Sequence, residues 1–275
     1  MASTGSQSGF GATRPACGTL TAVNVYHFGP ADGPTVLALH GVTGHGKRWA
    51  RLAADQLADL HVVAPDLRGH GRSSYLPPWT LEQLAADAIA LLDAPVVVVG
   101  HSFGAFVALH LARARPDLVR GLLLLDPSIG IEPQRLLEYA TATVESPDYT
   151  DVAEARNEKL GDAWAEVAAD VREAELAEHL VPTRDGRVGW RLCVPAIASY
   201  WSQMAREFVL PPADIPTIAV IAGNARPAYS SAEFRNALAA LPNVTMVEFD
   251  CDHMVPQARP AETAELVRKL LGADL

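Results

Sequence analysis

Residues 96–115 read VVVVGHSFGAFVALHLARAR, and this stretch says more about the fold than any other. The run of valines is typical of a strand buried on both faces, because β-branched side chains favour strands and a covered strand needs no polar positions. The Ala, Leu and Arg residues that follow favour a helix. Between the two, Gly100, Ser102 and Gly104 fit the pattern G-x-S-x-G, which is typical of a serine on a sharp turn from strand to helix.

Glycine is needed at two positions of this turn for a steric reason. A strand and a helix joined by so sharp a turn approach closely, and side chains at Gly100 and Gly104 would clash. The turn would lift the Ser102 hydroxyl above the sheet and place it at a helix N-terminus, where free N–H groups favour developing negative charge. We therefore predict that Ser102 is a nucleophile, against the alternative of a glycine-rich turn with an incidental serine.

Short runs of Val, Ile and Leu alternate with helical segments along most of the chain. Besides residues 95–100, the predicted buried strands are 35–40, 61–66, 119–126, 216–222 and 244–250, with a half-exposed edge strand within 20–28. Helical period marks residues 47–60, 80–93, 103–115, 231–241 and 260–271. Because parallel strands need crossover connections, this pattern predicts an α/β fold with a doubly wound, mostly parallel sheet and helices on both faces.

Residues 131–210 interrupt the alternation. This stretch contains no convincing buried strand but has amphipathic helical pieces at 133–143, 152–178 and 194–208. Prolines punctuate both of its ends, as expected where a chain leaves and re-enters a scaffold. We predict an inserted helical cap at residues 131–210, a core built from residues 19–130 and 211–275, and a frayed tail over residues 1–18.

Composition excludes several classes of protein. The chain has 275 residues, and its 22 Lys and Arg against 32 Asp and Glu give a formal net charge of −10, which repels nucleic acid and anionic lipid surfaces. Cys17, Cys193 and Cys251 show no C-x-x-C pairing, so we expect no disulfide framework, no metal site and a cytoplasmic location. No apolar run approaches the roughly 20 residues of a membrane-spanning helix.

A nucleophilic serine needs a base, and in this architecture the chain order is serine, acid, histidine. Three histidines follow Ser102. His110 lies on the same predicted helix and His179 in the predicted cap, whereas His253 follows the strand at 244–250. A loop there can deliver an imidazole to the carboxyl edge of the sheet, so His253 is the predicted base.

The acid is predicted to be Asp126, at the end of the strand at 119–126. The next strand, ending at Ala222, is followed by no acid until Glu233. Asp250 and Asp252 are alternatives, but side chains so close to the histidine in sequence seldom align with its far ring nitrogen. A second alternative is that Asp126 only caps its strand end.

Acyl transfer also needs donors for an oxyanion, usually the N–H after the nucleophile and one from a loop after an earlier strand. These are predicted to be the backbone N–H groups of Phe103 and Val42. His40 and the turn at 66–73 are interpreted as structural. Neither glycine-rich segment fits G-x-G-x-x-G or a P-loop, so nucleotide binding has no support.

Taken together, the loop at 40–44, the turn at 66–73, the turn at 100–104 and the His253 loop resemble the α/β-hydrolase superfamily, in particular its capped esterase and lipase-like members. The resemblance covers residues 20–271 and implies a Ser102/His253 catalytic pair, an oxyanion hole and no cofactor. The chain departs from the commonest pattern at Arg226, where an Asp would be expected. Some members take the acid from the preceding strand, which matches Asp126.

The leading functional hypothesis is a serine hydrolase that cleaves a small-molecule carboxylic ester through an acyl-enzyme. Thioesterase, lactonase or carbon–carbon bond hydrolase activity would use the same residues, and a ligand-binding receptor on a hydrolase scaffold is an alternative of a different class. A membrane-surface lipase is disfavoured by the many acidic residues of the cap. From the cap, Trp201 and Met204 are expected to contact the substrate.

Overall fold

One mixed sheet dominates the computed structural model, which describes residues 23–272. Within these residues its strands lie in the order β1-β3-β2-β4-β5-β8-β9. Every neighbouring pair is parallel except β1 with β3. The predicted doubly wound, mostly parallel sheet is confirmed, and the tail predicted at 1–18 lies outside the described residues. The strands are β1 Val25–Phe28, β2 Thr35–Leu39, β3 His61–Pro65, β4 Val96–His101, β5 Val119–Leu125, β8 Thr217–Ala222 and β9 Val244–Phe249.

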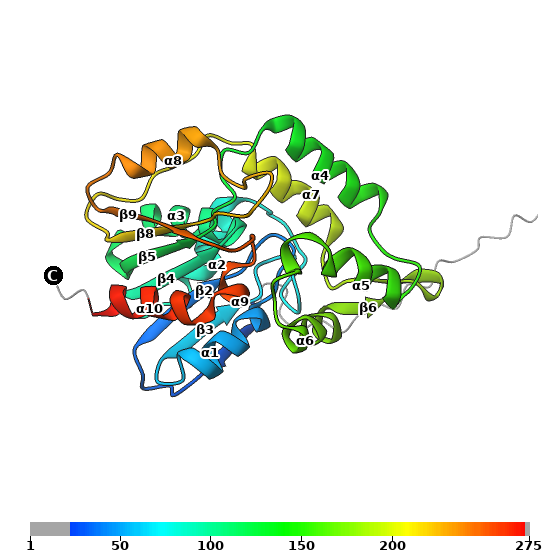
Figure 1. The fold of residues 1–275 in the computed structure, drawn as a ribbon, viewed down its shortest axis with the longest axis horizontal. Helices are drawn as coiled ribbons and strands as arrows, with labels where there is room; N and C mark the ends of the chain where they lie inside the picture. Colours follow the sequence, from blue (N-terminus) through cyan, green and yellow to red (C-terminus); the bar gives the residue numbers. More distant parts are fainter. Residues whose placement is uncertain (1–22, 273–275) are drawn as a thin grey trace, which may run out of the picture.

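Helices cover both faces of the sheet (Figure 1). The valines of β4 show the two layers directly, because Val96 and Val98 pack into one hydrophobic cluster and Val97 and Val99 into the other. On the first face lie α2 Leu81–Ile89, α3 Phe103–Ala114 and α8 Ala232–Ala239; on the second lie α1 Ala50–Gln56 and α10 Pro260–Leu271. Shorter helical turns are η1 Gly46–Trp49, η2 Pro116–Leu118 and α9 Val255–Ala258.

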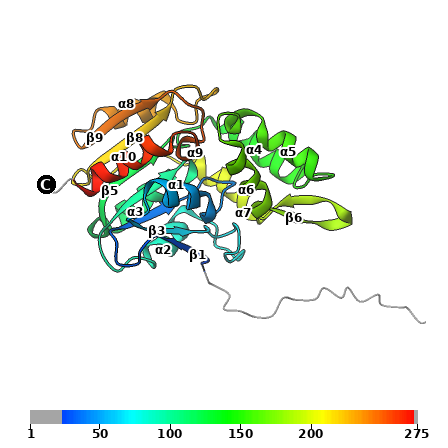
Figure 2. The same cartoon turned by 60° about the horizontal axis from the view of Figure 1, so that its bottom comes forward.

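Residues 131–210 lie to one side of the sheet in both views (Figures 1 and 2). They form α4 Pro133–Glu145, α5 Val152–Leu160, η3 Asp162–Trp164, α6 Ala169–His179, η4 Arg184–Gly186 and α7 Val194–Met204, with an antiparallel pair of β6 Leu180–Pro182 and β7 Val188–Trp190.

One local expectation for this segment is corrected, and one pair of strands was not predicted. The single helix expected over residues 152–178 ends at Gly161, whose ψ of 173° is extended; glycine is a poor helix former, so the break has a local cause. The strands β6 and β7 were also not expected. With three residues each, they are too short to show the alternation that identifies a strand.

The parallel arrangement brings four loops to one edge of the sheet. The register pairs Leu39 with Gly100 and His101 with Leu125, so β2, β4 and β5 end close to one level. The loops after β2, β4, β5 and β9 therefore meet at the carboxyl edge, where open α/β sheets bind their ligands. In the described part of the chain, no helix is both long and apolar enough to cross a membrane.

Candidate active site

Ser102 sits in a strained conformation between β4 and α3. Its φ of 56° and ψ of −121° lie where side chains are disfavoured, at a typical cost of about 1–3 kcal/mol. The flanking glycines allow the turn: a Cβ at Gly100 would lie 2.6 Å from the Ala105 nitrogen, and one at Gly104 would lie 2.3 Å from the Leu39 carbonyl oxygen. The steric reason predicted for these two glycines therefore matches their surroundings.

The side chains of Ser102, His253 and Asp126 form a continuous chain of hydrogen bonds. The distance from Ser102 Oγ to His253 Nε2 is 3.0 Å, and that from His253 Nδ1 to Asp126 Oδ2 is 2.5 Å. Asp126 Oδ1 accepts the backbone N–H of Ala222 at 3.1 Å. All three side chains are buried. The structure thus brings together the three residues predicted as nucleophile, base and acid.

The alternative acids have other partners. Asp252 Oδ1 accepts the backbone N–H of His253 itself at 2.6 Å, and Asp250 Oδ1 accepts the Asn224 amide at 3.0 Å. Glu233 is exposed in the first turn of α8. Among these candidates Asp126 is the carboxylate on the His253 ring, so it does more than cap the end of β5.

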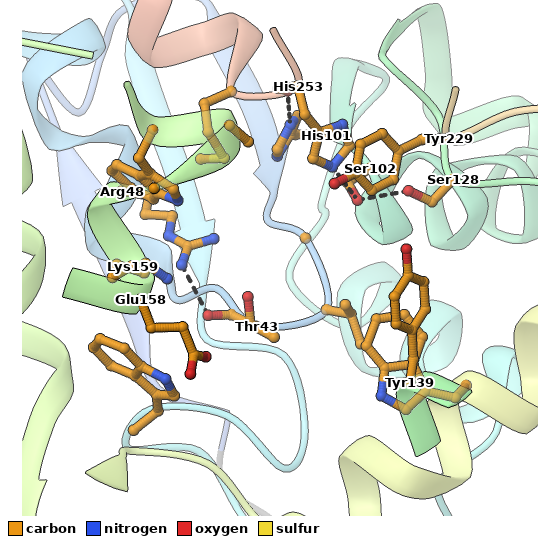
Figure 3. Close-up of a pocket in the computed structure, with 18 of the residues that line it drawn as sticks. Thr43, Arg48, His101, Ser102, Ser128, Tyr139, Glu158, Lys159, Tyr229 and His253 are labelled. Atoms are coloured by element: carbon orange, nitrogen blue, oxygen red, sulfur yellow. Dashed lines mark hydrogen bonds between the residues drawn. The ribbon is translucent and has the colours of Figure 1, made fainter. Parts of the chain in front are cut away.

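Two residues that the sequence reasoning missed hold the His253 loop in place (Figure 3). The His101 Nε2–H donates to the His253 carbonyl at 2.8 Å, and burial lowers the pKa of His101 well below its usual range, which keeps it neutral. The Tyr229 ring stacks on the His253 ring, with the ring centroids 3.5 Å apart. His101 was visible within the G-x-S-x-G motif, whereas no sequence signal marked Tyr229.

Ser128 is a third residue that the sequence reasoning missed. Its Oγ lies 2.8 Å from Ser102 Oγ, and its backbone N–H donates to the Ser102 carbonyl at 3.3 Å. When Ser102 donates its proton to His253, the Ser128 hydroxyl is the group that donates to Ser102 Oγ. Ser128 follows Asp126 by two positions, so the loop after β5 supplies both the acid and a hydrogen bond to the serine.

The two predicted oxyanion donors, the N–H groups of Phe103 and Val42, belong to the segments that follow β4 and β2. Phe103 is the first residue of α3, so its N–H has no acceptor within the helix. A Cβ at Gly41 would lie 3.1 Å from Ser102 Cβ, so the residue before Val42 lies close to the serine.

The residues interpreted as structural have structural contacts. Burial lowers the pKa of His40 well below its usual range, and the neutral ring donates from Nδ1 to the Gly41 carbonyl and accepts the Leu67 N–H at Nε2. Asp66 accepts the backbone N–H groups of Gly46 and Arg72. These bonds fix the loop after β2 and the turn at 66–73.

A cavity of about 420 Å³ opens above Ser102. Its walls come from the sheet edge and from residues 131–210. Figure 3 shows Ser102 and Ser128 on one side, with the Tyr139 hydroxyl directed toward Ser128, and Glu158 and Lys159 on the opposite side. Trp201, predicted to contact the substrate, lines this cavity. Met204 does not: it is 1% exposed and packs in the hydrophobic core below α7, so the expectation that it contacts substrate is corrected.

A buried ionic cluster borders the same cavity. Glu175 on α6 accepts Arg48 Nη2 at 2.6 Å and contacts His45 at 2.8 Å, and Lys159 Nζ lies 3.4 Å from it. Burial raises the pKa of Glu175, but Arg48 and Lys159 outweigh that effect and hold it well below its usual range. Burial, reinforced by the charge of Arg48, lowers the pKa of Lys159 to about 8. The cluster therefore stabilises the charge of Glu175, whereas burial, with Arg48, destabilises that of Lys159 despite the contact with Glu175.

This asymmetry predicts that Lys159→Met raises the free energy of unfolding at pH 7 by about 1–3 kcal/mol. The Lys159 pKa falls from 10.5 to about 8 on folding. The charged lysine therefore destabilises the folded state to its full extent below pH 8, and this destabilisation disappears as the pH rises to 10.5. Urea unfolding at pH 7 and pH 10 measures both effects. Lys47→Met, at a lysine that is 44% exposed, should change little. A Lys159→Met protein less stable than wild type at pH 7 would contradict the prediction.

Residues 36–266 match the alpha/beta hydrolase family. Lipase LipV of Mycobacterium tuberculosis is 49% identical over 259 residues, which cover 91% of this chain and 98% of that protein. The sn-1-specific diacylglycerol lipase ABHD11 of Mus musculus is 31% identical over 210 residues, or 71% of this chain and 67% of that protein. The crystal structure of E-2-(acetamidomethylene)succinate hydrolase shares the fold, with a TM-score of 0.78 at 24% identity and coverage of 91% of this chain and 95% of that one.

Proposed function

The chain belongs to the alpha/beta hydrolase family, and from this premise we propose that it hydrolyses carboxylic esters of small molecules through a covalent acyl-enzyme. The observation that carries the proposal is the hydrogen-bonded chain from Ser102 through His253 to Asp126 beside a cavity large enough for a small molecule. The 49% identity to a protein named as a lipase supports an ester as the substrate, ahead of a thioester, a lactone or a carbon–carbon bond.

In the first half of the proposed reaction, Ser102 Oγ attacks the ester carbonyl carbon while its proton passes to His253 Nε2. Asp126 accepts the hydrogen bond from His253 Nδ1–H, which fixes the tautomer and stabilises the imidazolium. The bond from the carbonyl carbon to the alcohol oxygen then breaks, and His253 returns the proton to the leaving alcohol. In the second half, water attacks the acyl-enzyme with His253 as base and releases the acid.

The tetrahedral intermediates carry their negative charge on the former carbonyl oxygen. We assign the backbone N–H groups of Phe103 and Val42 as its donors, because Phe103 follows Ser102 directly, Gly41 next to Val42 lies close to Ser102, and backbone donors need no reorganisation during the reaction. Every step of this mechanism is carried by side chains and backbone groups of the chain and by water, so the proposal calls for no cofactor and no metal.

Residues 131–210 act as a cap in this proposal, and residues 19–130 with 211–275 form the hydrolase core. The support is that the cavity above Ser102 is closed by side chains of that segment, among them Tyr139, Lys159 and Trp201. The net charge of −10 argues against nucleic acid as a partner. We assign the protein to the cytoplasm on its cysteines, of which the described Cys193 and Cys251 are free.

A fluorophosphonate probe is expected to label Ser102 once per chain and to stop ester hydrolysis in proportion to labelling. The physical reason is that the probe needs the same activated hydroxyl and the same oxyanion donors as an ester. Peptide mapping of the labelled residue and turnover of a short aryl ester measure the two outcomes. Labelling at another serine, or undiminished hydrolysis by the fully labelled protein, would overturn the proposal, and no reaction with either compound would favour a ligand-binding receptor.

A further inference from the structure

A second cavity of about 430 Å³ adjoins the cavity of Ser102. We call it the distal chamber; its inner wall contains Leu192, Val194 and Ile197. The two cavities are contiguous, since they share the wall residues Thr43, Tyr139, Glu158, Trp190 and Trp201. Figure 3 shows Glu158 and Tyr139 on opposite sides of Thr43, with the Tyr139 hydroxyl directed toward Ser128. A molecule bound at Ser102 can therefore extend past Thr43 into the distal chamber.

The aromatic residues around the chamber have their polar atoms occupied. Trp201 Nε1–H donates to Thr143 Oγ1 at 3.0 Å, and Trp190 Nε1–H donates to the Tyr149 hydroxyl at 3.0 Å. That hydroxyl in turn donates to Glu158 Oε1 at 2.6 Å. Likewise, the Tyr139 hydroxyl accepts Arg135 Nε–H at 2.7 Å. With these polar atoms paired, the rings have mainly apolar faces left to offer a ligand.

We propose that the distal chamber binds an apolar chain of the ester, so that the substrates are esters with a medium-length hydrocarbon chain. This inference rests on the proposed function, because it assigns the occupant of a chamber next to the reacting serine. Glu158 is the charged residue on the chamber wall, and its Oε1 already accepts the Tyr149 hydroxyl. The aliphatic side chains and ring faces favour hydrocarbon, and each methylene moved from water onto them raises kcat/KM by about three- to fourfold. The length of chain that the chamber can hold is limited at its rim. The exposed residues there are Ala142, Ser146 and Pro147, and a chain that extends beyond them returns to solvent.

The test is kcat/KM for two series of esters: methyl esters of acids from acetic to decanoic, and acetates of alcohols of the same lengths. In one series the value should rise with chain length and then level off where the chain reaches the rim, which also identifies the acyl or alcohol part as the occupant. A steady fall with length in both series, in a protein that hydrolyses acetate esters, would overturn the chamber while leaving the proposed function intact.

Ala142→Phe places a ring in the chamber from an exposed position of α4, where folding should tolerate it. It is expected to lower the octanoate-to-acetate ratio of kcat/KM by about tenfold or more, through loss of the space for several methylenes. Thr141→Phe is the matched control, because Thr141 is exposed on the same helix and lines neither cavity. Equal ratios in Ala142→Phe, Thr141→Phe and wild type would also overturn the proposal.

Measuring ester binding to an inactive variant tests the chamber independently of the hydrolysis reaction. Methyl octanoate should quench the tryptophan fluorescence of Ser102→Ala, because Trp190 and Trp201 line the chamber. Adding Ala142→Phe should weaken this binding by about tenfold. If no ester is hydrolysed at any length, the proposed function fails, and this titration still decides the chamber: saturable quenching that Ala142→Phe weakens supports it, and its absence overturns it.

Discussion

Replacing Ser102 with alanine is expected to leave a folded protein whose kcat for ester hydrolysis is lower by about 10⁶-fold. Removal of Oγ removes the nucleophile of the covalent route, together with the hydroxyl that His253 Nε2 and Ser128 Oγ both contact. The loss should be incomplete, since the N–H groups of Phe103 and Val42 would still polarise an ester for attack by water. A small residual rate with a nearly unchanged KM is therefore the expected signature.

The measurement is kcat and KM on one activated ester, with circular dichroism to confirm the fold. Ser199→Ala is the matched control: Ser199 lies on α7, donates its hydroxyl to the Trp79 carbonyl and lines neither cavity. It should lose at most a few-fold in kcat. Turnover by purified Ser102→Ala within tenfold of wild type would rule out the acyl-enzyme mechanism.

The fold was predictable because its signals are local. A strand covered on both faces must be apolar at successive positions, and Val97 and Val98 of β4 meet opposite hydrophobic clusters as that rule requires. The sharp turn after β4 is indicated in the sequence by Gly100 and Gly104. Parallel strands then bring the residues that follow them to one edge, so chain order alone could select Asp126 and His253 as the predicted partners of Ser102.

The parts of the site that could not be predicted depend on contacts between segments that are distant along the chain. Tyr229 stacks on His253 because the loop after β8 folds over the one after β9, and the sequence around Tyr229 carries no pattern that says so. Helical period shows which side of α7 is apolar. It does not show whether that side meets a cavity, as Trp201 does, or the core, as Met204 does. Likewise, the distal chamber exists only once α4, α7 and β7 are packed together.

Asp126→Asn is expected to lower kcat by about 10⁴-fold, the loss typical of this substitution at the acid of a serine protease triad. The change keeps the size of the side chain and its burial between β5 and β8. What changes is the direction of the hydrogen bond to His253 Nδ1. The position of Asp126 makes that direction unusually well determined, because each carboxylate oxygen has its own partner: Ala222 N–H for Oδ1 and His253 Nδ1 for Oδ2.

An asparagine at position 126 has one oxygen to offer, and the Ala222 N–H can only donate, so the oxygen must stay with Ala222. The amide NH₂ then faces His253 Nδ1 and donates to it, which forces the ring proton onto Nε2. In that tautomer Nε2 cannot accept the Ser102 proton, although no heavy atom has moved.

Asn224→Ala is the matched control, in the loop that follows β8. It should lose far less activity than Asp126→Asn, since Asn224 bonds to Asp250 and not to the histidine ring. Values of kcat for wild type and the two variants on one activated ester decide the matter, with circular dichroism to confirm that each protein is folded. Should Asp126→Asn keep a near-wild-type kcat while Asp250→Asn or Asp252→Asn collapses, the acid that orients His253 lies within the His253 loop and not at the end of β5.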